Sequence, residues 1–396
     1  MRHLLTAKLA ILISLSLATF LHGASAWADY STCVDGIKSE ATRNGISPRT
    51  IDSAFRIAKP DPKVLEFESF QPEFKTPVWD YLASLVDDER VKDGMTAMQE
   101  NAKSLALAEL RFGVSRYVIA AIWGVESDFG REMGARPLVS SLLTLACSES
   151  RRPKYFRGEL MATLRIIDRG DIPLEELNGS WAGAFGQTQF MPSTFLRLAV
   201  DLDGSGRDIV ANASAALGST ANYLNKSGWK AGESWGFEVK LPSNYSGPSG
   251  RKNRKSMSYW RSIGVRKIDS EELTGSDSGL LLPAGREGPA FLVNRNFESI
   301  YSYNASESYA LAAAILAQRL AGGRGIVAPW PTDDPGLSRA ERRELQQLLA
   351  KRGYDVGAPD GAIGAKTRAA VADFEAKSAL KVDGRASVKV LNSLRQ

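Results

Sequence analysis

The chain contains only two histidines, His3 and His22, and both lie within its first 28 residues. A protein that lost this segment would contain no imidazole, which excludes Ser-His-Asp and Cys-His catalysis and histidine-based zinc sites. Cysteine is equally scarce, because Cys33 and Cys147 are the only two and cannot form a structural zinc site. Carboxylates, amides and tyrosines are therefore left to perform any chemistry.

The N-terminus has the pattern of an export signal. Basic residues precede an apolar run over residues 9–21, and small residues follow it. The run is too short to span a bilayer comfortably, so the pattern predicts a cleavable signal peptide over residues 1–28, with an uncleaved anchor as the alternative. The sequence before Cys33 is not a lipoprotein signal, and no lipidation is expected. In an oxidising compartment the two cysteines can pair, so a Cys33–Cys147 disulfide is expected.

The charge balance gives no indication of a strongly anionic partner. The chain has 50 Lys and Arg against 45 Asp and Glu, a formal net charge of +5. Loss of Arg2 and Lys8 with the signal peptide would lower it to +3. This mild excess favours loose contact with anionic polymers, and no nucleic-acid-binding motif is present.

Residues 119–130, IAAIWGVESDFG, place Glu126 within an apolar helical run. On a helix its face is shared with Ile122, Trp123 and Phe129, so the carboxyl group should be poorly hydrated. Poor hydration and a position near a helix C-terminus both raise the pKa of a carboxyl group. A Glu that is protonated near neutral pH can donate a proton to a leaving sugar, as in glycosidases. The alternative is an exposed acid at a helix end.

Residues 180–194, SWAGAFGQTQFMPST, form a glycine-rich loop that follows this helix in sequence. Ser180 and Gln189 stand there with other neutral hydrogen-bonding side chains, among one Trp and two Phe. The glycines allow the backbone to approach a ligand closely, and Pro192 suits the first turn of the next helix. Aromatic faces beside amide groups favour a carbohydrate as the ligand.

The sequence resembles the catalytic domain of the membrane-bound lytic transglycosylase B family of bacterial cell-wall enzymes. The resemblance rests on the order of five motifs, which are the two segments above together with RRPKYFRGEL, a D-x-D-G-S-G loop and YSYNASESYA. The resemblance covers residues 29–325. It implies a mainly α (α+β) fold with a lysozyme-like catalytic domain, and a periplasmic enzyme that requires no cofactor. The implied substrate is the glycan strand of peptidoglycan, which is cleaved between N-acetylmuramic acid and N-acetylglucosamine to leave a 1,6-anhydromuramyl end.

The resemblance also implies roles for single residues. Glu126 would act first as acid and then as base, while the 6-hydroxyl of the muramic acid attacks the anomeric carbon. Residues of the sugar groove and of a basic pair near the lactyl or peptide side of the substrate correspond to Ser180, Gln189, Tyr223, Tyr303, Tyr309, Arg151 and Arg152. From the sequence alone, Tyr223 and Tyr309 are equally compatible with core positions, and the arginines with ordinary surface charges.

Two other functions remain open from the sequence. A lysozyme-type muramidase would need a second carboxylate near Glu126. Asp128 is only two residues away, but on a helix it should point away from Glu126, which favours a structural role. The other alternative is a non-catalytic scaffold protein that binds peptidoglycan through a retained groove.

Residues 201–212, DLDGSGRDIVAN, resemble a calcium loop in which Asp201, Asp203 and Ser205 are alternating oxygen ligands. The closing Glu is missing, because Asn212 stands at the twelfth position. With two carboxylates any Ca²⁺ site should be weak, and a metal-free loop is the favoured interpretation.

The rest of the chain shows changes of pattern that predict further parts. Residues 238–290 are rich in Pro, Ser and Gly and predict a small β-rich insertion. Residues 66–82 have aromatics at irregular spacing and predict an extended arm, while Gly113 should end one helix and Ser115 should cap the next.

The C-terminal part of the sequence predicts a separate module. Residues 326–336 have the composition of a linker. Residues 337–396 contain three short helical patterns, two of them preceded by Asp-Gly turns at 360–361 and 383–384. This module resembles the peptidoglycan-binding domain family, a three-helix module that binds the cell wall.

Overall fold

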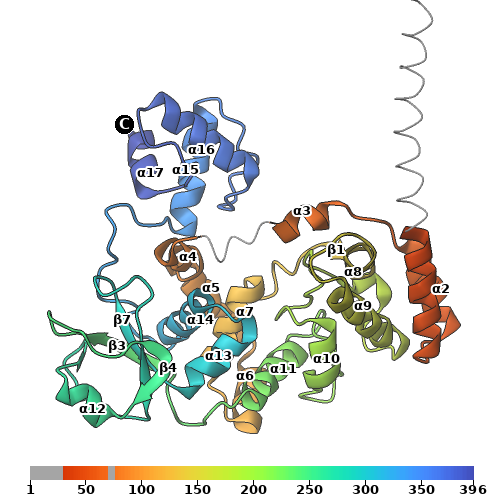
Figure 1. Cartoon of the computed structure of the whole chain (residues 1–396), viewed down its shortest axis with the longest axis horizontal. Coiled ribbons are helices and arrows are strands. Elements are labelled where there is room, and N and C mark those ends of the chain that lie inside the picture. Colours follow the sequence, from red (N-terminus) through yellow and green to blue (C-terminus); the bar gives the residue numbers. More distant parts are fainter. Residues whose placement is uncertain (1–29, 70–75) are drawn as a thin grey trace, which may run out of the picture. The chain divides into compact units, whose positions relative to one another are not determined.

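The computed structural model describes residues 30–69 and 76–396. The expected signal peptide, with His3 and His22, lies outside the described residues. The chain forms two compact units, drawn in Figure 1. Unit 1 contains residues up to 69 together with 133–197, and unit 2 contains 76–132 together with 198–396. Both units therefore include parts of the range that resembles a catalytic domain.

Unit 1 is mainly helical. Its elements are a helix over residues 30–43, α2 (Pro48–Ile57), α3 (Lys63–Ser69), β1 (Arg136–Pro137), α8 (Leu138–Cys147), α9 (Pro153–Asp168), the 3₁₀ helix η2 (Leu174–Glu176), β2 (Asn178–Gly179) and α10 (Pro192–Leu198). α8 packs along α9, and α2 packs against both. A disulfide joins Cys33 in the first helix to Cys147 at the end of α8, with 5.7 Å between the Cα atoms.

Unit 2 combines a helical core, a small sheet and the C-terminal module. Its elements are α4 (Val78–Leu85), α5 (Asp88–Glu100), α6 (Ala102–Phe112), α7 (Arg116–Ser127), α11 (Ala213–Lys226), β3 (Gly236–Lys240), β4 (Gly250–Lys255), α12 (Met257–Ser262), β5 (Arg266–Lys267), β6 (Ser278–Leu281), β7 (Ala290–Val293), α13 (Arg295–Asn304), α14 (Glu307–Leu320), α15 (Arg339–Lys351), α16 (Ala365–Lys377) and α17 (Val388–Arg395).

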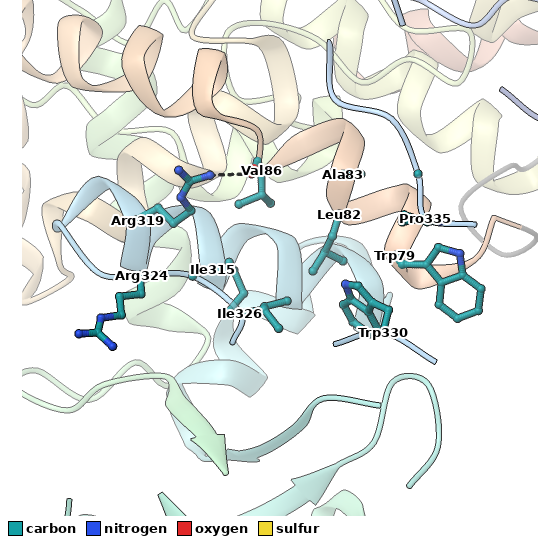
Figure 2. Close-up of a pocket in the computed structure, with 12 residues that line it drawn as sticks. Trp79, Leu82, Ala83, Val86, Ile315, Arg319, Arg324, Ile326, Trp330 and Pro335 are labelled. Atoms are coloured by element: carbon teal, nitrogen blue, oxygen red, sulfur yellow. Dashed lines mark hydrogen bonds between the residues drawn. The ribbon is translucent and has the colours of Figure 1, made fainter. Parts of the chain in front are cut away.

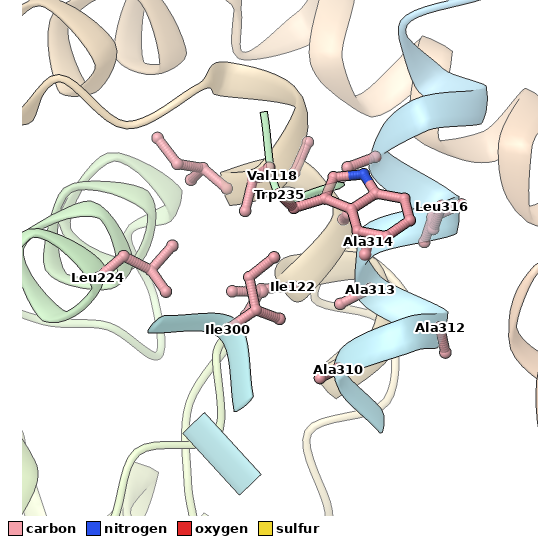
Figure 3. Close-up of a cluster of buried hydrophobic side chains, with 14 of the residues drawn as sticks. Val118, Ile122, Leu224, Trp235, Ile300, Ala310, Ala312, Ala313, Ala314 and Leu316 are labelled. Carbon is pink, nitrogen blue, oxygen red and sulfur yellow. The ribbon is translucent and has the colours of Figure 1, made fainter. Parts of the chain in front are cut away.

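The core of unit 2 forms where α14 packs against α7, with α4, α5 and α13 also in contact with α14 (Figure 3). A run of alanines, which includes Ala310 and Ala312 to Ala314, is fully buried on α14. Small side chains allow two helices to approach closely, and a helix that is apolar on all sides is suited to a core position. On α7, Val118 and Ile122 complete this contact. The pairing fixes α7, which carries Glu126.

The predicted β-rich insertion is confirmed. It forms a five-stranded antiparallel sheet with the strand order β4-β6-β7-β3-β5. The strands β6 and β7 are buried along their whole length, whereas β4 at the edge has no buried residue. Strands that are covered on both faces are usually rich in apolar residues, as AFLV is throughout and SGLL is apart from Ser278.

The C-terminal module has three helices, α15 to α17, around a core that includes Leu345, Leu349 and Phe374. A capping box begins α15, because the Ser338 hydroxyl accepts the N–H of Glu341 and the Glu341 carboxylate accepts the N–H of Ser338. The helices of both units together confirm, for the described residues, the mainly helical fold class predicted from the sequence.

Two buried side chains hold the Asp-Gly turns of this module. Gln346 Oε1 accepts the N–H of Gly361 at 2.7 Å. Glu375 Oε2 accepts the N–H groups of Asp383 and Gly384 at 2.9 and 2.8 Å. Each turn thus directs its backbone donors inward to one side chain, as buried polar groups require.

Some local expectations fail. The predicted extended arm over 66–82 is wrong, because α3 and α4 cover most of its described residues. Pro77 is the N-cap residue of α4, and the irregular spacing of the aromatic residues gave no helical pattern from which this helix could be predicted. Gly113 ends α6 with φ of 70°, as predicted. Ser115 is the N-cap residue of α7, but its side chain makes no capping hydrogen bond.

Among residues 30–69 and 76–396, no helix is long and apolar enough to cross a membrane.

Candidate active site

Glu126 lies in the last turn of α7 and is held by Tyr309 of α14, within unit 2. The Tyr309 hydroxyl donates a hydrogen bond to Glu126 Oε1 at 2.6 Å. Tyr309 is 1% exposed, so its ring is fixed by the core that pairs the two helices. The contact leaves the other carboxyl oxygen, Oε2, for a different partner.

Burial raises the pKa of Glu126 to about 7, although the hydrogen bond from Tyr309 lowers it. Loss of hydration destabilises the carboxylate, and one hydroxyl donor only partly compensates. The same burial raises the pKa of Tyr309 well above its usual range, and the Glu126 carboxylate adds to that effect. Tyr309 therefore stays a hydrogen-bond donor, while Glu126 can gain and lose a proton near neutral pH.

In unit 2, Tyr303 packs against Tyr309, and Tyr223 packs against Tyr303. The rings of Tyr303 and Tyr309 are stacked with centroids 6.3 Å apart and planes at 10°. The Tyr223 ring is tilted against Tyr303 at 4.7 Å, and its hydroxyl donates to the carbonyl of Ser302 at 2.6 Å. The Tyr303 hydroxyl lies 3.4 Å from that of Thr220. The structure thus links three predicted groove residues to Glu126, with Tyr309 as its hydrogen-bond donor.

The backbone after α7 turns sharply. Asp128 and Phe129 have φ of 51° and 61°, in the left-handed region that non-glycine residues rarely adopt. This turn folds Phe129 back onto Trp123, with ring centroids 5.6 Å apart and edge to face. A Cβ atom on Gly124 would lie 2.5 Å from the Phe129 ring, so glycine is required there. Strained backbone of this kind is often found at functional sites.

Asp128 has surroundings opposite to those of Glu126. Its carboxylate makes ion pairs with Arg90 at 3.3 Å, Arg131 at 2.9 Å and Arg339 at 2.9 Å. Burial raises the pKa of Asp128, but Arg90 and Arg339 lower it further, so the net shift is downward. Asp128 is therefore an ionised structural residue at the end of α7.

A cavity of about 480 Å³ in unit 2 is lined by Glu126 together with residues of the C-terminal module. The module contributes Arg339, Arg342 and residues 360–362. Glu132 and Asp360 also line the cavity, and Asp360 Oδ1 accepts the N–H of Ala362 at 2.8 Å. Sequence reasoning missed these arginines. The acidic run DDERVKD at 87–93 and the basic run RAERR at 339–343 were the available signal, because they have opposite charges.

The remaining predicted groove residues lie in unit 1, on the loop before α10. Phe185 and Phe190 exchange two backbone hydrogen bonds of 3.0 Å, and both rings are buried. They close a tight turn over residues 186–189, in which Gln189 has a φ of 49°. The Ser180 hydroxyl oxygen accepts the N–H of Ala184 at 3.0 Å, which holds the start of the loop.

The Gln189 amide is fixed by two acceptors of unit 1. Its Nε2 donates to the carbonyls of Met133 at 3.0 Å and Gly186 at 2.9 Å. Because both amide hydrogens are directed to the backbone, the side-chain carbonyl Oε1 has a defined orientation as an acceptor. The loop then enters α10, where the buried Glu159 carboxylate accepts the N–H and hydroxyl of Ser193 at 2.8 and 2.7 Å. A carboxylate at this helix N-terminus is favourable.

Arg151 and Arg152 lie in unit 1 before α9, and both side chains are exposed. The backbone N–H of Arg151 donates to Glu68 at 3.0 and 3.1 Å. The Arg152 guanidinium lies over the Tyr155 ring at 4.7 Å. The geometry keeps Arg152 on an aromatic support and leaves the Arg151 side chain at the surface.

The loop over residues 201–212, which resembles a calcium loop, is held by hydrogen bonds within itself. Asp201 Oδ1 accepts the N–H of Gly204 at 2.7 Å, and Asp203 Oδ1 accepts the N–H and hydroxyl of Ser205. In the described part of the chain, no group of three or more Asp, Glu, His or Cys is arranged to hold a metal ion. The residues present do not fit the oxygen-rich shell of a tight calcium site.

Comparison with known proteins is consistent with this geometry. Residues 29–318 match the family of the transglycosylase SLT domain, and residues 338–394 match a putative peptidoglycan binding domain. The membrane-bound lytic murein transglycosylase B of Escherichia coli (strain K12) is 33% identical over 245 residues. These residues are 61% of this chain and 66% of that enzyme, just under two thirds of its length.

Solved structures extend the similarity to nearly the whole chain. SltB3 from Pseudomonas aeruginosa in complex with NAG-anhNAM-pentapeptide is 43% identical, with a TM-score of 0.74 over 93% of this chain and 99% of that chain. The E. coli lytic transglycosylase SLT35 in complex with calcium is 28% identical, with a TM-score of 0.64 over 74% of this chain and 92% of that chain.

Proposed function

This chain belongs to the transglycosylase SLT domain family, and from that premise we propose that it is a periplasmic lytic murein transglycosylase. It cleaves the β-1,4 bond between N-acetylmuramic acid and N-acetylglucosamine in peptidoglycan and leaves 1,6-anhydromuramyl ends. The observation that carries the proposal is Glu126, whose pKa of about 7 lets it act as acid and base in one reaction. The similar protein SltB3 has been crystallised in complex with NAG-NAM-pentapeptide and in complex with NAG-anhNAM-pentapeptide.

The reaction follows from the protonation of Glu126. The neutral carboxyl group donates its proton to the glycosidic oxygen as the bond to the muramyl C1 breaks. The resulting carboxylate accepts the proton of the muramyl 6-hydroxyl, whose oxygen forms the new bond to C1. Glu126 ends the cycle protonated again, and no water is consumed. Tyr309 donates to Oε1 throughout, which directs Oε2 toward the substrate.

The other groove residues have supporting roles in this proposal. Gln189 Oε1 is an oriented acceptor suited to the N–H of an N-acetyl group. Ser180 holds the loop through Ala184 and retains its hydroxyl hydrogen for a sugar oxygen. The partly exposed rings of Tyr223 and Tyr303 suit the apolar faces of sugars, and the buried ring of Tyr309 supports Tyr303. Arg151 and Arg152 supply positive charge for the lactyl or peptide carboxylates.

A hydrolase of the lysozyme type is the second candidate, because Glu132 and Asp360 line the same cavity as Glu126. Either group would have to activate a water molecule. Asp128 is less suited to this role, since three arginines hold it ionised and engaged.

Digestion of purified sacculi followed by mass spectrometry of the released muropeptides tests the proposal. A transglycosylase gives products 18 mass units lighter than the hydrated ones, because no water enters the bond. Hydrated products that disappear in Glu132→Gln or Asp360→Asn would contradict it and support the hydrolase. Sacculus binding without released fragments would support a non-catalytic scaffold.

Export and the domain layout are part of the same proposal. Residues 1–28 are the signal peptide, 29–325 the catalytic domain, 326–336 the linker and 337–396 the wall-binding module. The disulfide between Cys33 and Cys147 supports an oxidising compartment. Alkylation of both thiols in folded protein isolated from the periplasm would contradict this part.

Calcium is at most a weak ligand in this proposal. The E. coli relative SLT35 is known in complex with calcium. Here Asp203 Oδ1 already accepts the N–H and the hydroxyl of Ser205, and we assign no step of the reaction to a metal.

A further inference from the structure

A second cavity lies in unit 2, away from the residues discussed so far, and has a volume of about 270 Å³ (Figure 2). Its walls come from three places: α4 contributes Trp79 and Leu82, α14 contributes Ile315, and the segment after α14 contributes Ile326 and Trp330. It includes neither Glu126 nor any residue assigned above to the sugar groove. No role in the proposed reaction accounts for it.

Two indole rings form one end of this cavity. The centroids of Trp79 and Trp330 are 6.3 Å apart and their planes are tilted by 49°. Both rings are only half-buried. The buried Nε1–H of Trp79 has no hydrogen-bond partner among the described residues. This N–H has no exposed surface, so a ligand would contact the exposed faces of the two rings and not this donor.

Two arginines form the other end, and Figure 2 shows Leu82, Ile315 and Ile326 between them and the indoles. Arg319 is engaged, because it donates to the carbonyl of Val86 at 3.0 Å and to Asp88 at 2.6 Å. Arg324 is exposed, and the described residues place no carboxylate within ion-pair distance of it. Its charge is therefore available to an anion.

The wall formed by the linker is fixed. The buried carboxylate of Glu238 on β3 accepts the N–H groups of Val327 at 2.8 Å and Ala328 at 2.7 Å. At the far end of the linker, a Cβ atom on Gly336 would lie 2.6 Å from Asp80 Cα, so the backbone packs directly on α4. A wall that is already ordered lowers the entropy lost when a ligand binds.

We propose that this cavity is an additional binding site for peptidoglycan fragments, besides the sugar groove and the wall-binding module, in which an N-acetylated amino sugar contacts Trp79 and Trp330 and a lactyl or peptide carboxylate pairs with Arg324. Indole faces pack against the apolar faces of sugars, and the half-buried rings of Trp79 and Trp330 leave such faces exposed. The identity of the ligand rests on the proposed function. The site would keep the enzyme on its polymer between cleavage events.

The test is a titration of the full chain carrying Glu126→Gln, followed through the indole N–H signals in ¹H–¹⁵N spectra. The probe is N-acetylglucosaminyl-1,6-anhydro-N-acetylmuramyl tetrapeptide. Trp79→Phe and Trp330→Phe assign the two signals, which should shift together and saturate. Arg324→Glu leaves the indoles in place and should weaken binding of this probe at least tenfold. It should change binding of uncharged di-N-acetylchitobiose less than twofold.

Lys103→Ala, which removes an exposed charge on α6, is the matched control and should leave both affinities unchanged. Unshifted Trp79 and Trp330 signals at millimolar probe would overturn the site, as would equal affinities before and after Arg324→Glu. The titration reads binding alone, so its result is independent of whether the wild-type protein releases anhydromuropeptides. Failure of the proposed function would appear in the product analysis instead.

Discussion

The last turn of α7 and the turn that follows it contain two carboxyl groups in opposite surroundings. Glu126 is poorly hydrated and has one hydroxyl donor, and its pKa is about 7. Asp128 is two residues away and is paired with three guanidinium groups, so its pKa lies below the usual range. The backbone turn at Asp128 separates the two environments. The two side chains differ by only one methylene group, so their different roles follow from their surroundings and not from their own chemistry.

The strongest test of this contrast is the rate of cleavage. Glu126→Gln keeps the size of the side chain but cannot transfer a proton, and we expect kcat to fall roughly 10²–10⁴-fold with sugar binding retained. Asp128→Asn should lower kcat less than tenfold in protein that remains folded. Muropeptide release from sacculi measures both. Similar losses in the two variants would break the distinction.

The second test is stability. Asp128→Asn leaves Arg90 and Arg339, whose side chains are 10% and 15% exposed, without their shared carboxylate. We expect a loss of about 2–4 kcal/mol, because breaking a largely buried ion pair leaves charges uncompensated. Asp373→Asn is the control, since its pair with Lys377 is exposed and should contribute little to stability. Urea unfolding of both variants measures the difference, and equal losses would contradict the structural role of Asp128.

The sequence predicts those differences between Glu126 and Asp128 that depend on residues nearby in the chain. Apolar residues around position 126 predict a raised pKa, and helical spacing predicts that Asp128 points elsewhere. Arg339 could not be predicted as a partner, because it is 211 residues away and the contact exists only after the module packs on α5 and α7. The left-handed Gln189 escapes prediction for a different reason, since φ above zero is expected of glycine.

Tyr309→Phe sharpens the account of Glu126. The lost hydroxyl is the group that lowers the pKa of Glu126, so the alkaline limb of kcat/KM should move to higher pH. We also expect kcat/KM to fall about tenfold, because Oε2 is no longer directed. Tyr303→Phe, next to it in the stack, should leave the pH profile in place. A pH–rate profile for each variant checks this, and an unchanged alkaline limb in Tyr309→Phe would contradict the hydrogen-bond role.

A smaller effect is the dependence of stability on pH. The folded state holds the proton of Glu126 up to about pH 7, whereas an ordinary Glu loses it near 4.5. Between these values the native state binds more protons than the unfolded state, so stability falls as pH rises. Glu126→Gln removes this decline and should become more stable than wild type by about 1–2 kcal/mol at pH 8, after allowance for partial exposure. A constant difference in Tm from pH 4 to 8 would contradict it.

The smallest expected effect concerns a third group of carboxylates, in the loop 201–212. Because Asp201 and Asp203 are already hydrogen-bonded to their own loop, micromolar Ca²⁺ should raise Tm by less than about 1 °C. Thermal melts with Ca²⁺ and with EDTA measure this. A large rise that Asp203→Ala abolishes would show that the loop rearranges into a real site.

The disulfide has a mechanical consequence. Cys33 and Cys147 are separated by 114 positions, and Glu126 lies between them. When the chain is pulled from its ends, the force passes through the sulfur atoms and bypasses this segment. About 400 Å of extended chain is thereby shielded from tension. An enzyme bound to a stretched polymer can lose structure elsewhere under load while α7 remains outside the path of the force.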